Sequence, residues 1–312
     1  GFFSQLIILS KRAAQNLYRD KPRTIFRIVQ NIIVAVVLGL IFLRLDTDEI
    51  AVRDRSGLLF FIIINQGFGT MFQTLNVFLE EREIFAKERS AAWYSAGPYF
   101  LSKSLAELPM TFTPIILGCI VYFIANLNPS AEAFGFFLLV IYLTTFVTES
   151  LGLAIGALAT SVAMANAMAP LLLIFLLMFG GFYINPDSIP VYFKWAEYVS
   201  FVRYGFEALV VNEFEGTTFT TVEGAPLPGS AIISSLGMDA DWRWIDVGIL
   251  VGMAFLFRLL AFLFLKFLRR GPRGKTLEPL SDADTHLSLE SKETSDANNN
   301  NDDTALKERK KK

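Results

Sequence analysis

Cysteine and histidine are almost absent from this 312-residue sequence, which contains one of each, Cys119 and His286. A single cysteine cannot form an intramolecular disulfide, so an external loop held by a disulfide within this chain is excluded. Neither a His/Cys metal cluster nor a Ser-His-Asp triad can be assembled around one histidine in a polar tail. We therefore predict no metal site and no catalytic residue in this chain.

An excess of charge and a nucleotide-binding loop are also lacking. The sequence has 28 Lys and Arg against 30 Asp and Glu, a net charge of -2, and this balance indicates no nucleic-acid partner. The P-loop pattern G-x-x-x-x-G-K-[ST] is absent, because Gly274-Lys275-Thr276 has Arg269 where the first glycine is required. The chain thus has no ATPase motif of its own. It starts at Gly1 without a signal peptide, so we expect a piece of a longer gene product.

Hydrophobic residues are abundant: they fill 53% of the positions, the mean hydropathy is +0.45, and there are 30 phenylalanines. They gather in blocks, and a helix of about 20 apolar residues crosses the roughly 30 Å hydrocarbon layer of a bilayer. The sequence therefore predicts an all-α membrane protein with six transmembrane helices. The predicted spans are residues 25–43, 57–79, 105–125, 133–160, 162–184 and 244–268.

Proline and glycine predict irregularities in two of these spans. Pro109 and Pro114 each remove a backbone donor, so we expect the third span to bend. The pair Gly180-Gly181, near the outer end of the fifth span, permits either close packing or a break in the helix.

The distribution of Lys and Arg predicts the orientation in the membrane. With the N-terminus inside, the inner segments 1–27, 80–104 and 266–275 hold fifteen of these cations, and the longer outer segments hold six. Cytoplasmic loops are enriched in Lys and Arg. We therefore predict that both termini are cytoplasmic.

An amphipathic helix is predicted before the first span. Phe3 and Ile7 lie on its apolar side and Lys11 and Arg12 on the other, a pattern typical of a helix that lies in the membrane interface. An ordinary soluble helix is the alternative, and the position directly before a span favours the interfacial helix.

Two further segments lie outside the spans. Residues 189–212 are rich in aromatic side chains and predict short helices at the outer interface, followed by an external loop over 215–241. Residues 276–312 are polar and predict a disordered cytoplasmic tail, so that the transmembrane domain covers residues 1–275.

Polar side chains inside the spans are candidate functional groups because burying them in lipid is unfavourable. Glu149, in the fourth span, is either a substrate or proton contact or a carboxyl that is hydrogen-bonded to its neighbours. Asn65 and Gln66, in the second span, either bridge helices or line a cavity.

The charged start of segment 80–104 also has two interpretations. It is either a solvated connecting helix or a coupling helix that touches a cytoplasmic partner, and its predicted side of the membrane allows both.

Two longer motifs carry a family resemblance. Residues 81–89 and 99–109, with Tyr94 between them, resemble the connecting helix and third-span start of White-type (subfamily G) ABC transporters. The second motif resembles the end of the fifth span and the external re-entrant helices of the same family. It comprises residues 181–185, 188–190, 203–209 and 212–214. The similarity covers roughly residues 1–270, in the right order.

The resemblance implies a function and partners for the whole protein. Members export lipids, sterols or amphipathic xenobiotics with ATP and Mg at a nucleotide-binding domain, which this chain lacks and which the same gene or a partner chain must supply. Two half-transporters pair as a homo- or heterodimer within the lipid bilayer. We expect the plasma membrane, with an internal membrane as the alternative. A non-transporting membrane scaffold or a truncated product is the alternative function, and a passive channel is disfavoured because no span has a regular charged lining.

The resemblance also assigns residues. Asn65 and Phe68 match the asparagine and aromatic clamp of the multidrug members, and Phe182 and Tyr183 stand where other members have a two-leucine plug between the inner and outer cavities. Aromatic residues in place of leucines are a departure from the family pattern. The substrate cavity is expected at Asn65, Phe68, Ile174 and Leu177, and the gate at Phe182 and Tyr183. The coupling helix is expected at Glu81, Arg82, Phe85, Glu88 and Arg89, and a polar contact at Glu149.

Overall fold

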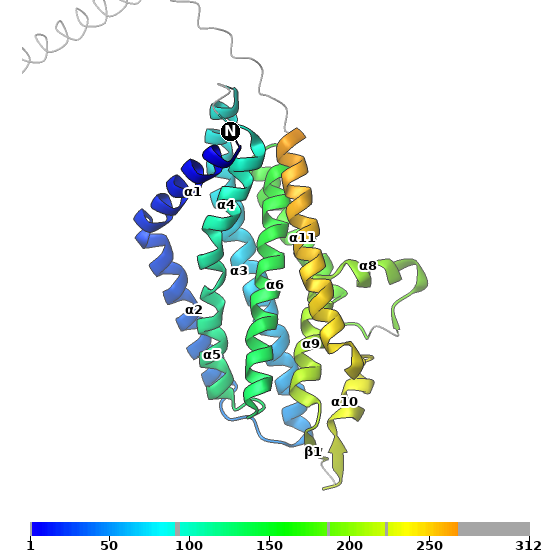
Figure 1. The fold of residues 1–312 in the computed structure, drawn as a ribbon. Helices are drawn as coiled ribbons and strands as arrows, with labels where there is room; N and C mark the ends of the chain where they lie inside the picture. The colour runs from blue at the N-terminus through cyan, green and yellow to red at the C-terminus, as the bar shows by residue number, and fades with distance from the viewer. Residues whose placement is uncertain (1, 91–93, 186–187, 222–223, 268–312) are drawn as a thin grey trace, which may run out of the picture. The chain divides into compact units, whose positions relative to one another are not determined.

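The computed structural model describes residues 2–90, 94–185, 188–221 and 224–267, and these form a bundle of long helices (Figure 1). The predicted tail, residues 276–312, and the last residues of the predicted domain, 268–275, lie outside the described residues. The prediction of a largely helical membrane protein is confirmed.

The helices and strands follow one another along the chain in this order: α1 (Phe2–Arg19), α2 (Lys21–Ile41), α3 (Glu49–Ser90), α4 (Ala96–Thr111), α5 (Thr113–Ala125), α6 (Ala131–Leu158), α7 (Val162–Met178), the 3-10 turn η2 (Val191–Phe193), α8 (Lys194–Val199), α9 (Phe201–Phe214), β1 (Thr218–Thr220), β2 (Pro226–Pro228), α10 (Gly229–Ser235), the 3-10 turn η3 (Ala240–Trp242) and α11 (Arg243–Phe267).

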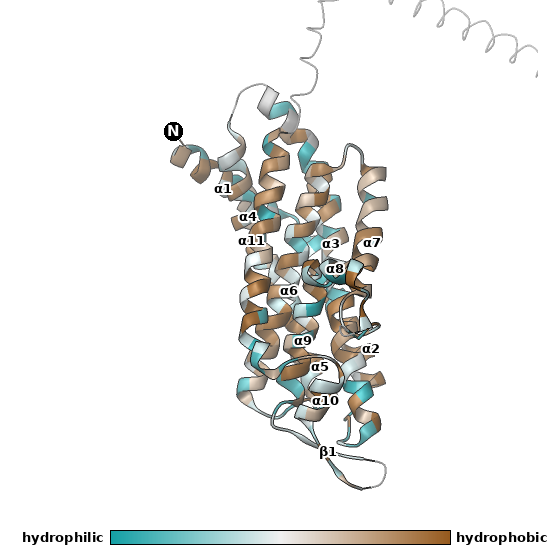
Figure 2. Ribbon diagram, turned by 90° about the vertical axis from the view of Figure 1, so that its right-hand side faces the viewer, coloured by the Kyte–Doolittle hydropathy of each residue, from teal (hydrophilic) through white to brown (hydrophobic). Residues whose placement is uncertain are grey.

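Five helical stretches among the described residues are long and apolar enough to cross a membrane, and each overlaps a predicted span. They are Lys21–Ile41, Glu49–Arg82, Ala96–Ala125, Ala131–Leu158 and Ala240–Phe267. The remaining predicted span, 162–184, coincides with α7, which is apolar but has 17 residues, fewer than the roughly 20 a crossing needs. Figure 2 shows hydrophobic residues along most of α7 and α11. The count of six therefore stays a prediction.

Gly180 and Gly181 explain why α7 ends where it does. Gly181 has a φ of 83°, a left-handed conformation that breaks the helix at little steric cost. A Cβ on Gly180 would lie 2.7 Å from Val202 Cγ1 and 3.1 Å from the carbonyl oxygen of Leu177, so α9 approaches closely here. The glycine pair thus provides both the break and the close packing that the sequence permits.

The third predicted span is interrupted, as its prolines indicate. α4 ends at Thr111 and α5 begins at Thr113, with Phe112 between them. Pro109 lies inside α4 and Pro114 in the first turn of α5, and neither can donate a backbone hydrogen bond. The expected bend is confirmed as a break at Phe112.

Helix α3 differs from its prediction in length. It has 42 residues and continues through Ser90, whereas the predicted span ended at Leu79. The sequence between residues 79 and 90 contains neither Gly nor Pro, so nothing ends the helix at the membrane edge. The charged segment is therefore a continuation of the second span rather than a separate connecting helix.

Helix α6 forms the centre of the bundle, with α4 and α5 on one side and α9 and α11 on the other in Figure 1. Gly152 and Gly156 let α3 approach it: a Cβ on Gly152 would lie 3.3 Å from the carbonyl oxygen of Met71, and one on Gly156 would lie 2.7 Å from Phe78. Small residues at such contacts allow the close helix packing that is common in membranes. Helix α9 is buried on nearly all sides, against α3, α6 and α11.

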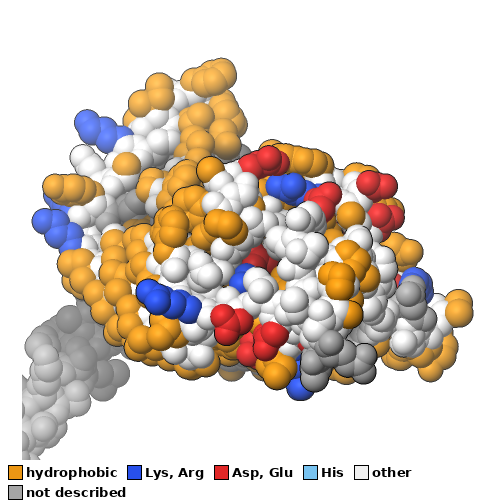
Figure 3. Space-filling view, turned by 90° about the horizontal axis from the view of Figure 1, so that it is seen from below, with side chains coloured by type: hydrophobic (Ala, Val, Ile, Leu, Met, Phe, Trp, Pro, Cys, Tyr) orange, Lys and Arg blue, Asp and Glu red, His pale blue; other side chains and the backbone are white. Residues whose placement is uncertain are grey.

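A short hairpin, which the all-α prediction missed, lies within the predicted external loop. Strands β1 and β2 pair antiparallel, with Thr218 opposite Pro228. The Thr220 amide donates to the carbonyl of Thr47 at 2.9 Å, so the hairpin also pairs with the loop between α2 and α3. On the end of the bundle that carries β1, acidic and basic side chains are interspersed with hydrophobic ones (Figure 3).

Candidate functional site

Three aromatic rings and one amide form a stripe along α3. Phe61, Asn65, Phe68 and Phe72 are spaced four, three and four residues apart, which places them on one side of a helix. Phe61 is 45% exposed, and the other three are half-buried. The rings of Phe68 and Phe72 stack with their centres 6.4 Å apart. The predicted pair Asn65 and Phe68 therefore belongs to a longer, partly exposed stripe.

Helix α7, which packs on α3, has an exposed apolar stripe of its own. Leu171, Ile174 and Met178 are all about half exposed or more. Leu177 is 9% exposed and belongs to the buried core of the bundle. Of the two predicted cavity residues on this helix, Ile174 faces outward and Leu177 faces α7's neighbours.

Phe182 and Tyr183, the predicted gate, belong to an aromatic cluster. The ring of Phe182 stacks on Phe60 of α3 at 4.4 Å, and Phe206 of α9 meets Phe60 edge-on at 5.2 Å. Tyr183 also meets Phe60 edge-on, at 5.3 Å. Offset-stacked and edge-on contacts of this kind hold aromatic rings in fixed positions. The sequence analysis identified two of the four rings and missed Phe60 and Phe206.

Glu149 is 2% exposed and has partners from two other helices. The Thr111 hydroxyl of α4 donates to its Oε2 at 2.8 Å, and Arg258 of α11 lies 3.7 Å from the same oxygen. Arg258 also donates from Nε to the Ser150 hydroxyl at 3.1 Å and lies over the ring of Phe146. These contacts match the interpretation in which the carboxyl is hydrogen-bonded to its neighbours.

The predicted coupling residues mostly turn inward. Arg82 donates to the carbonyl of Gly156 at 2.8 Å and to the carbonyl of Ala159, so it caps the C-terminal end of α6. A cation is favourable at a helix C-terminus. Phe85 is 1% exposed and stacks on Tyr99 of α4 at 4.4 Å. The side chain of Arg89 lies outside the described residues.

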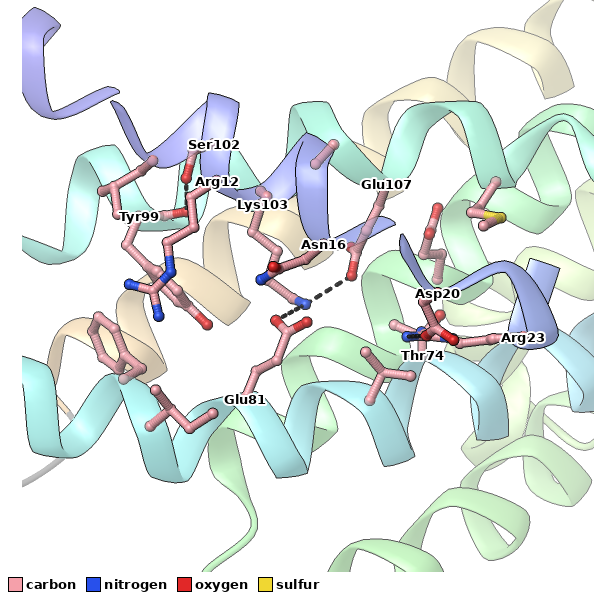
Figure 4. A pocket seen from close by; sticks show the side chains of 18 of the residues that line it. Arg12, Asn16, Asp20, Arg23, Thr74, Glu81, Tyr99, Ser102, Lys103 and Glu107 are labelled. Atoms are coloured by element: carbon pink, nitrogen blue, oxygen red, sulfur yellow. Dashed lines mark hydrogen bonds and ion pairs between the residues drawn. The ribbon is translucent and has the colours of Figure 1, made fainter. Parts of the chain in front are cut away.

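The two acidic coupling residues form ion pairs with other helices. Glu81 pairs with Lys103 of α4, which also lies 2.8 Å from Glu107, as Figure 4 shows. Glu88 accepts a hydrogen bond from Arg12 of α1 at 2.9 Å and another from the Tyr94 hydroxyl. Whether this part of α3 touches a cytoplasmic partner stays a prediction.

The pKa of Glu88 lies below its ordinary value. Partial burial raises the pKa of this carboxyl, and the hydrogen bonds from Arg12 and Tyr94 outweigh that effect. The same pair raises the pKa of Arg12, chiefly through its hydrogen bond to Glu88. Arg12, which was predicted on the polar side of an interfacial helix, also ties that helix to α3.

A buried ion pair, which the sequence analysis missed, joins the N-terminal part of α3 to the C-terminal end of α9. Arg55 pairs with Glu213, and its Nη2 also donates to the carbonyl of Leu45 at 2.8 Å. Glu213 accepts from the amide of Asn128 at 3.1 Å. A lone charge within an apolar run, as at Arg258, was the available signal for such residues, but it does not name the partner.

The residues that the structure describes contain no group of three or more His, Cys, Asp or Glu that could hold a metal ion.

With the positions of these side chains known, comparison with known proteins identifies the architecture. A family model described as "ABC-2 type transporter" matches residues 4–214, from α1 to the end of α9 and more than half of the chain. The chain belongs to the ABC-2 type transporter family.

Relatives of this ABC-2 domain are G-family ABC transporters. The chain is 36% identical to "ABC transporter G family member 7" of Arabidopsis thaliana over 220 residues, which cover 70% of this chain and 30% of the relative. It is 34% identical to "Protein white" of Drosophila melanogaster over 254 residues, covering 78% of this chain and 36% of the relative. It is 30% identical to "Broad substrate specificity ATP-binding cassette transporter ABCG2" of Bos taurus over 283 residues, covering 86% of this chain and 43% of the relative.

The resemblance to White-type, subfamily G transporters is thereby confirmed. The chain is an ABC-2 membrane domain and an integral, multi-pass membrane protein. It spans 30% to 43% of the length of these relatives. The α3 stripe, α7 and the aromatic cluster of Phe60, Phe182, Tyr183 and Phe206 all lie inside the matched region.

Proposed function

We propose that this ABC-2 domain is the permease part of an ATP-driven exporter of lipids, sterols or amphipathic xenobiotics. The observation that carries the proposal is the α3 stripe of Phe61, Asn65, Phe68 and Phe72. The stripe is partly exposed, and it includes an amide inside a membrane span, where a surface that met only lipid would gain nothing from a polar group.

A second half-transporter, as a homodimer or heterodimer partner, covers this stripe and completes a central cavity. Two Phe68 rings that face each other across the dimer axis sandwich a flat apolar ligand, and Asn65 supplies a hydrogen bond. Ile174 extends the apolar lining from α7, and Leu177 supports it from behind. The name of the cattle relative includes broad substrate specificity, which supports a wide cavity lined by apolar and aromatic groups.

The outer gate of the cavity is formed by Phe182 and Tyr183. The contacts of Phe60 and Phe206 support this assignment because they hold Phe182 against α3 and α9. In the same proposal, α7 together with residues 179–184 forms the sixth crossing, and α8 and α9 re-enter the outer half of the bundle. Glu149 holds α4, α6 and α11 together and makes no contact with substrate.

ATP and Mg act at a nucleotide-binding domain in the same gene product or in a partner chain. Both termini are cytoplasmic, in the plasma membrane or an internal membrane, so that the charged end of α3 faces that domain. The coupling contact is then the side of residues 81–89 that faces away from the bundle. The side chains on the opposite side already bind α1, α4 and α6.

Substitution of Phe68 tests the cavity. Phe68→Ala removes the central ring of the stripe, so ATP-dependent uptake into inverted vesicles should fall about two- to tenfold, since one aromatic contact is worth about 0.5–1.5 kcal/mol beyond its buried area. Surface expression should persist because the side chain is half-exposed in the protomer. Phe26→Ala, an exposed ring on α2, is the matched control.

Two outcomes contradict the proposal. Unchanged transport in Phe68→Ala removes this residue from the cavity. Uptake that proceeds equally with a non-hydrolysable ATP analogue removes the ATP-driven exporter altogether.

A further inference from the structure

A cavity separate from the proposed transport cavity lies at the end of the bundle that carries α1. It is enclosed by α1, the start of α2, α3 and α4 (Figure 4). We call it the interfacial cavity. Its volume of about 210 Å³ is many times the roughly 10–15 Å³ that one water molecule requires. Apolar groups line part of it, among them Leu9, Val77 and Met110. None of the α3 stripe residues lines it, so it is distinct from the proposed transport cavity.

The charged groups that line the interfacial cavity are of both signs. Most of them pair with each other: Arg12 with Glu88, Arg23 with Asp20, and Lys103 with Glu81 and Glu107. Glu149 bonds to Thr111 and lies near Arg258. The pairs bring no large net charge of one sign, so the cavity does not select for a simple anion or a simple cation.

Three lining groups nevertheless have buried polar atoms without a hydrogen-bond partner among the described residues. They are Nη2 of Arg27, Oε2 of Glu107 and the hydroxyl of Tyr99. A buried polar atom of this kind costs about 1–3 kcal/mol if it stays unsatisfied, and more if it is charged. One cationic donor, one anionic acceptor and one hydroxyl beside the cavity therefore lack a partner among the described residues, and all three atoms are enclosed.

These groups define the chemistry of a complementary ligand. The guanidinium of Arg27 binds an anionic oxygen well, as a phosphate supplies, and Glu107 accepts from an N–H or O–H donor. A protonated primary amine has three such donors, whereas a trimethylammonium group has none and leaves Glu107 Oε2 unsatisfied. A phosphate alone satisfies Arg27 but brings negative charge to Glu107. The complementary ligand thus has a phosphodiester and a primary amine.

The location of the cavity identifies the source of such a ligand. It lies where α2, α3 and α4 reach the ends of their apolar stretches, beside the amphipathic α1, and thus at the depth of the lipid headgroups. The side of α1 that faces away from the bundle is apolar, with Phe3 76% and Ile7 68% exposed. Acyl chains have an apolar surface beside the cavity on which to lie.

We propose that the interfacial cavity binds the headgroup of an ethanolamine-type glycerophospholipid, with its phosphate at Arg27 and its ammonium at Glu107 and Tyr99. The bound lipid joins α1 to α2 and α4. The proposal rests on the membrane-spanning fold and not on the export function, so the two can fail independently.

The test uses the full-length protein, purified and placed in nanodiscs made of equal parts ethanolamine and choline phospholipids. Lipids that remain bound after transfer to detergent are counted by native mass spectrometry. We expect the wild type to retain ethanolamine lipid over choline lipid by about tenfold, the effect of one charge-assisted hydrogen bond. Equal retention of the two lipids, or retention of neither, overturns the proposal.

Variants test which residues cause the preference for ethanolamine lipid over choline lipid. Glu107→Gln and Arg27→Gln should each reduce it to less than threefold. Glu132→Gln and Arg53→Gln, which change exposed charges on other parts of the bundle, should leave it intact. An undiminished preference in both cavity variants overturns the assignment of these residues.

Two further experiments use the wild-type protein alone, so the proposal stays testable even if Glu107→Gln does not fold. In wild type, retention should fall stepwise through the mono-, di- and trimethylated headgroups, as N–H donors are removed. Equal retention of the mono-, di- and trimethylated lipids contradicts the role of Glu107. Soluble glycerophosphoethanolamine should compete poorly, and competition at the affinity of the lipid means that a free metabolite, not the bilayer, supplies the ligand.

Discussion

At the scale of single residues, two arginines stand out because they bind backbone carbonyls outside regular structure, Arg82 at the end of α6 and Arg55 in the α2–α3 loop and after α5. Arg82 bonds to the carbonyls of Gly156 and Ala159, and Arg55 to those of Leu45, Asp46 and Asn126. The last carbonyls of a helix have no partner within it, and near a membrane water is scarce. Both guanidinium groups therefore satisfy backbone that would otherwise be unpaired, whatever else they do.

Gly229 is a residue-scale prediction about stability. A Cβ at this position would lie 1.8 Å from the carbonyl oxygen of Phe214, where the hairpin and α10 meet the end of α9. Because backbone atoms must move to relieve that overlap, Gly229→Ala should destabilise the protein by about 1–3 kcal/mol or more. The lowered thermal unfolding midpoint of the purified protein measures this.

The control for Gly229→Ala is Gly248→Ala, in α11, where a new methyl group would meet nothing within 4 Å. Alanine is the better helix former, so this variant should be neutral or more stable by up to about 1 kcal/mol. If both alanine variants unfold at the wild-type temperature, the hairpin does not pack against α9 as described.

At the scale of elements, the contact between α1 and α3 should depend on pH. The pKa of Glu88 is lowered in the folded protein, so its contribution is complete above the pKa of an unfolded glutamate, about 4.3, and is lost as the pH falls through the lower folded value. As the pH falls through that lowered value, the Arg12–Glu88 pair should open. Hydrogen exchange in residues 2–19 should then increase.

Variants separate this pair from general acid unfolding. Glu88→Gln should raise exchange in residues 2–19 already at pH 7 and remove the extra increase at low pH. Glu80→Gln, an exposed neighbour on α3, should behave like the wild type. Identical pH profiles for wild type and Glu88→Gln rule out the pair as the tether of α1.

The elements differ in how far the sequence predicts them. Apolar runs identify five of the spans because their length and composition are local properties, and Pro109 and Pro114 locate the break at Phe112 for the same reason. The hairpin was missed because its strands have three residues each and β2 is Pro-Leu-Pro, a composition typical of a loop. Its bond to Thr47 was missed because the two partners are over 170 residues apart in sequence. The Arg55–Glu213 pair, 158 residues apart, was missed because a single sequence does not show which buried charges meet.

The candidate site was predictable to a similar degree. The family motif located Asn65 and Phe68, and helical spacing extends the stripe to Phe61 and Phe72. Burial of Leu177 was not predictable, because which side of α7 meets the bundle depends on tertiary packing. The residues assigned to coupling were read as surface charges, whereas Glu81 and Glu88 bind cations on α4 and α1.

At the scale of the whole molecule, α3 connects the two ends of the bundle. Its 42 residues give a length of about 63 Å at 1.5 Å per residue, roughly twice the hydrocarbon thickness. The same continuous helix carries the α3 stripe and the segment that contacts α1, α4 and the end of α6. We therefore expect a movement at the Ser90 end of α3 to reach Phe68 along this helix.

Substitution of Arg82 tests whether the charged end of α3 is coupled to the proposed cavity. Arg82→Gln removes hydrogen bonds that fix α3 to the end of α6, the most buried of the spans. We expect a loss of about 1–3 kcal/mol in stability. We also expect a smaller ratio of substrate-stimulated to basal ATPase activity for the full-length transporter in proteoliposomes, because α3 then moves independently of α6.

Glu80→Gln is again the control, since it alters a charge on the same turn region without disturbing the end of α6. Its stimulation ratio should equal that of the wild type. A variant Arg82→Gln that unfolds at lower temperature but keeps the wild-type ratio shows that Arg82 only caps α6. In that case coupling must pass through α1 or α4, and Lys103, which binds α3 through Glu81, becomes the next residue to substitute.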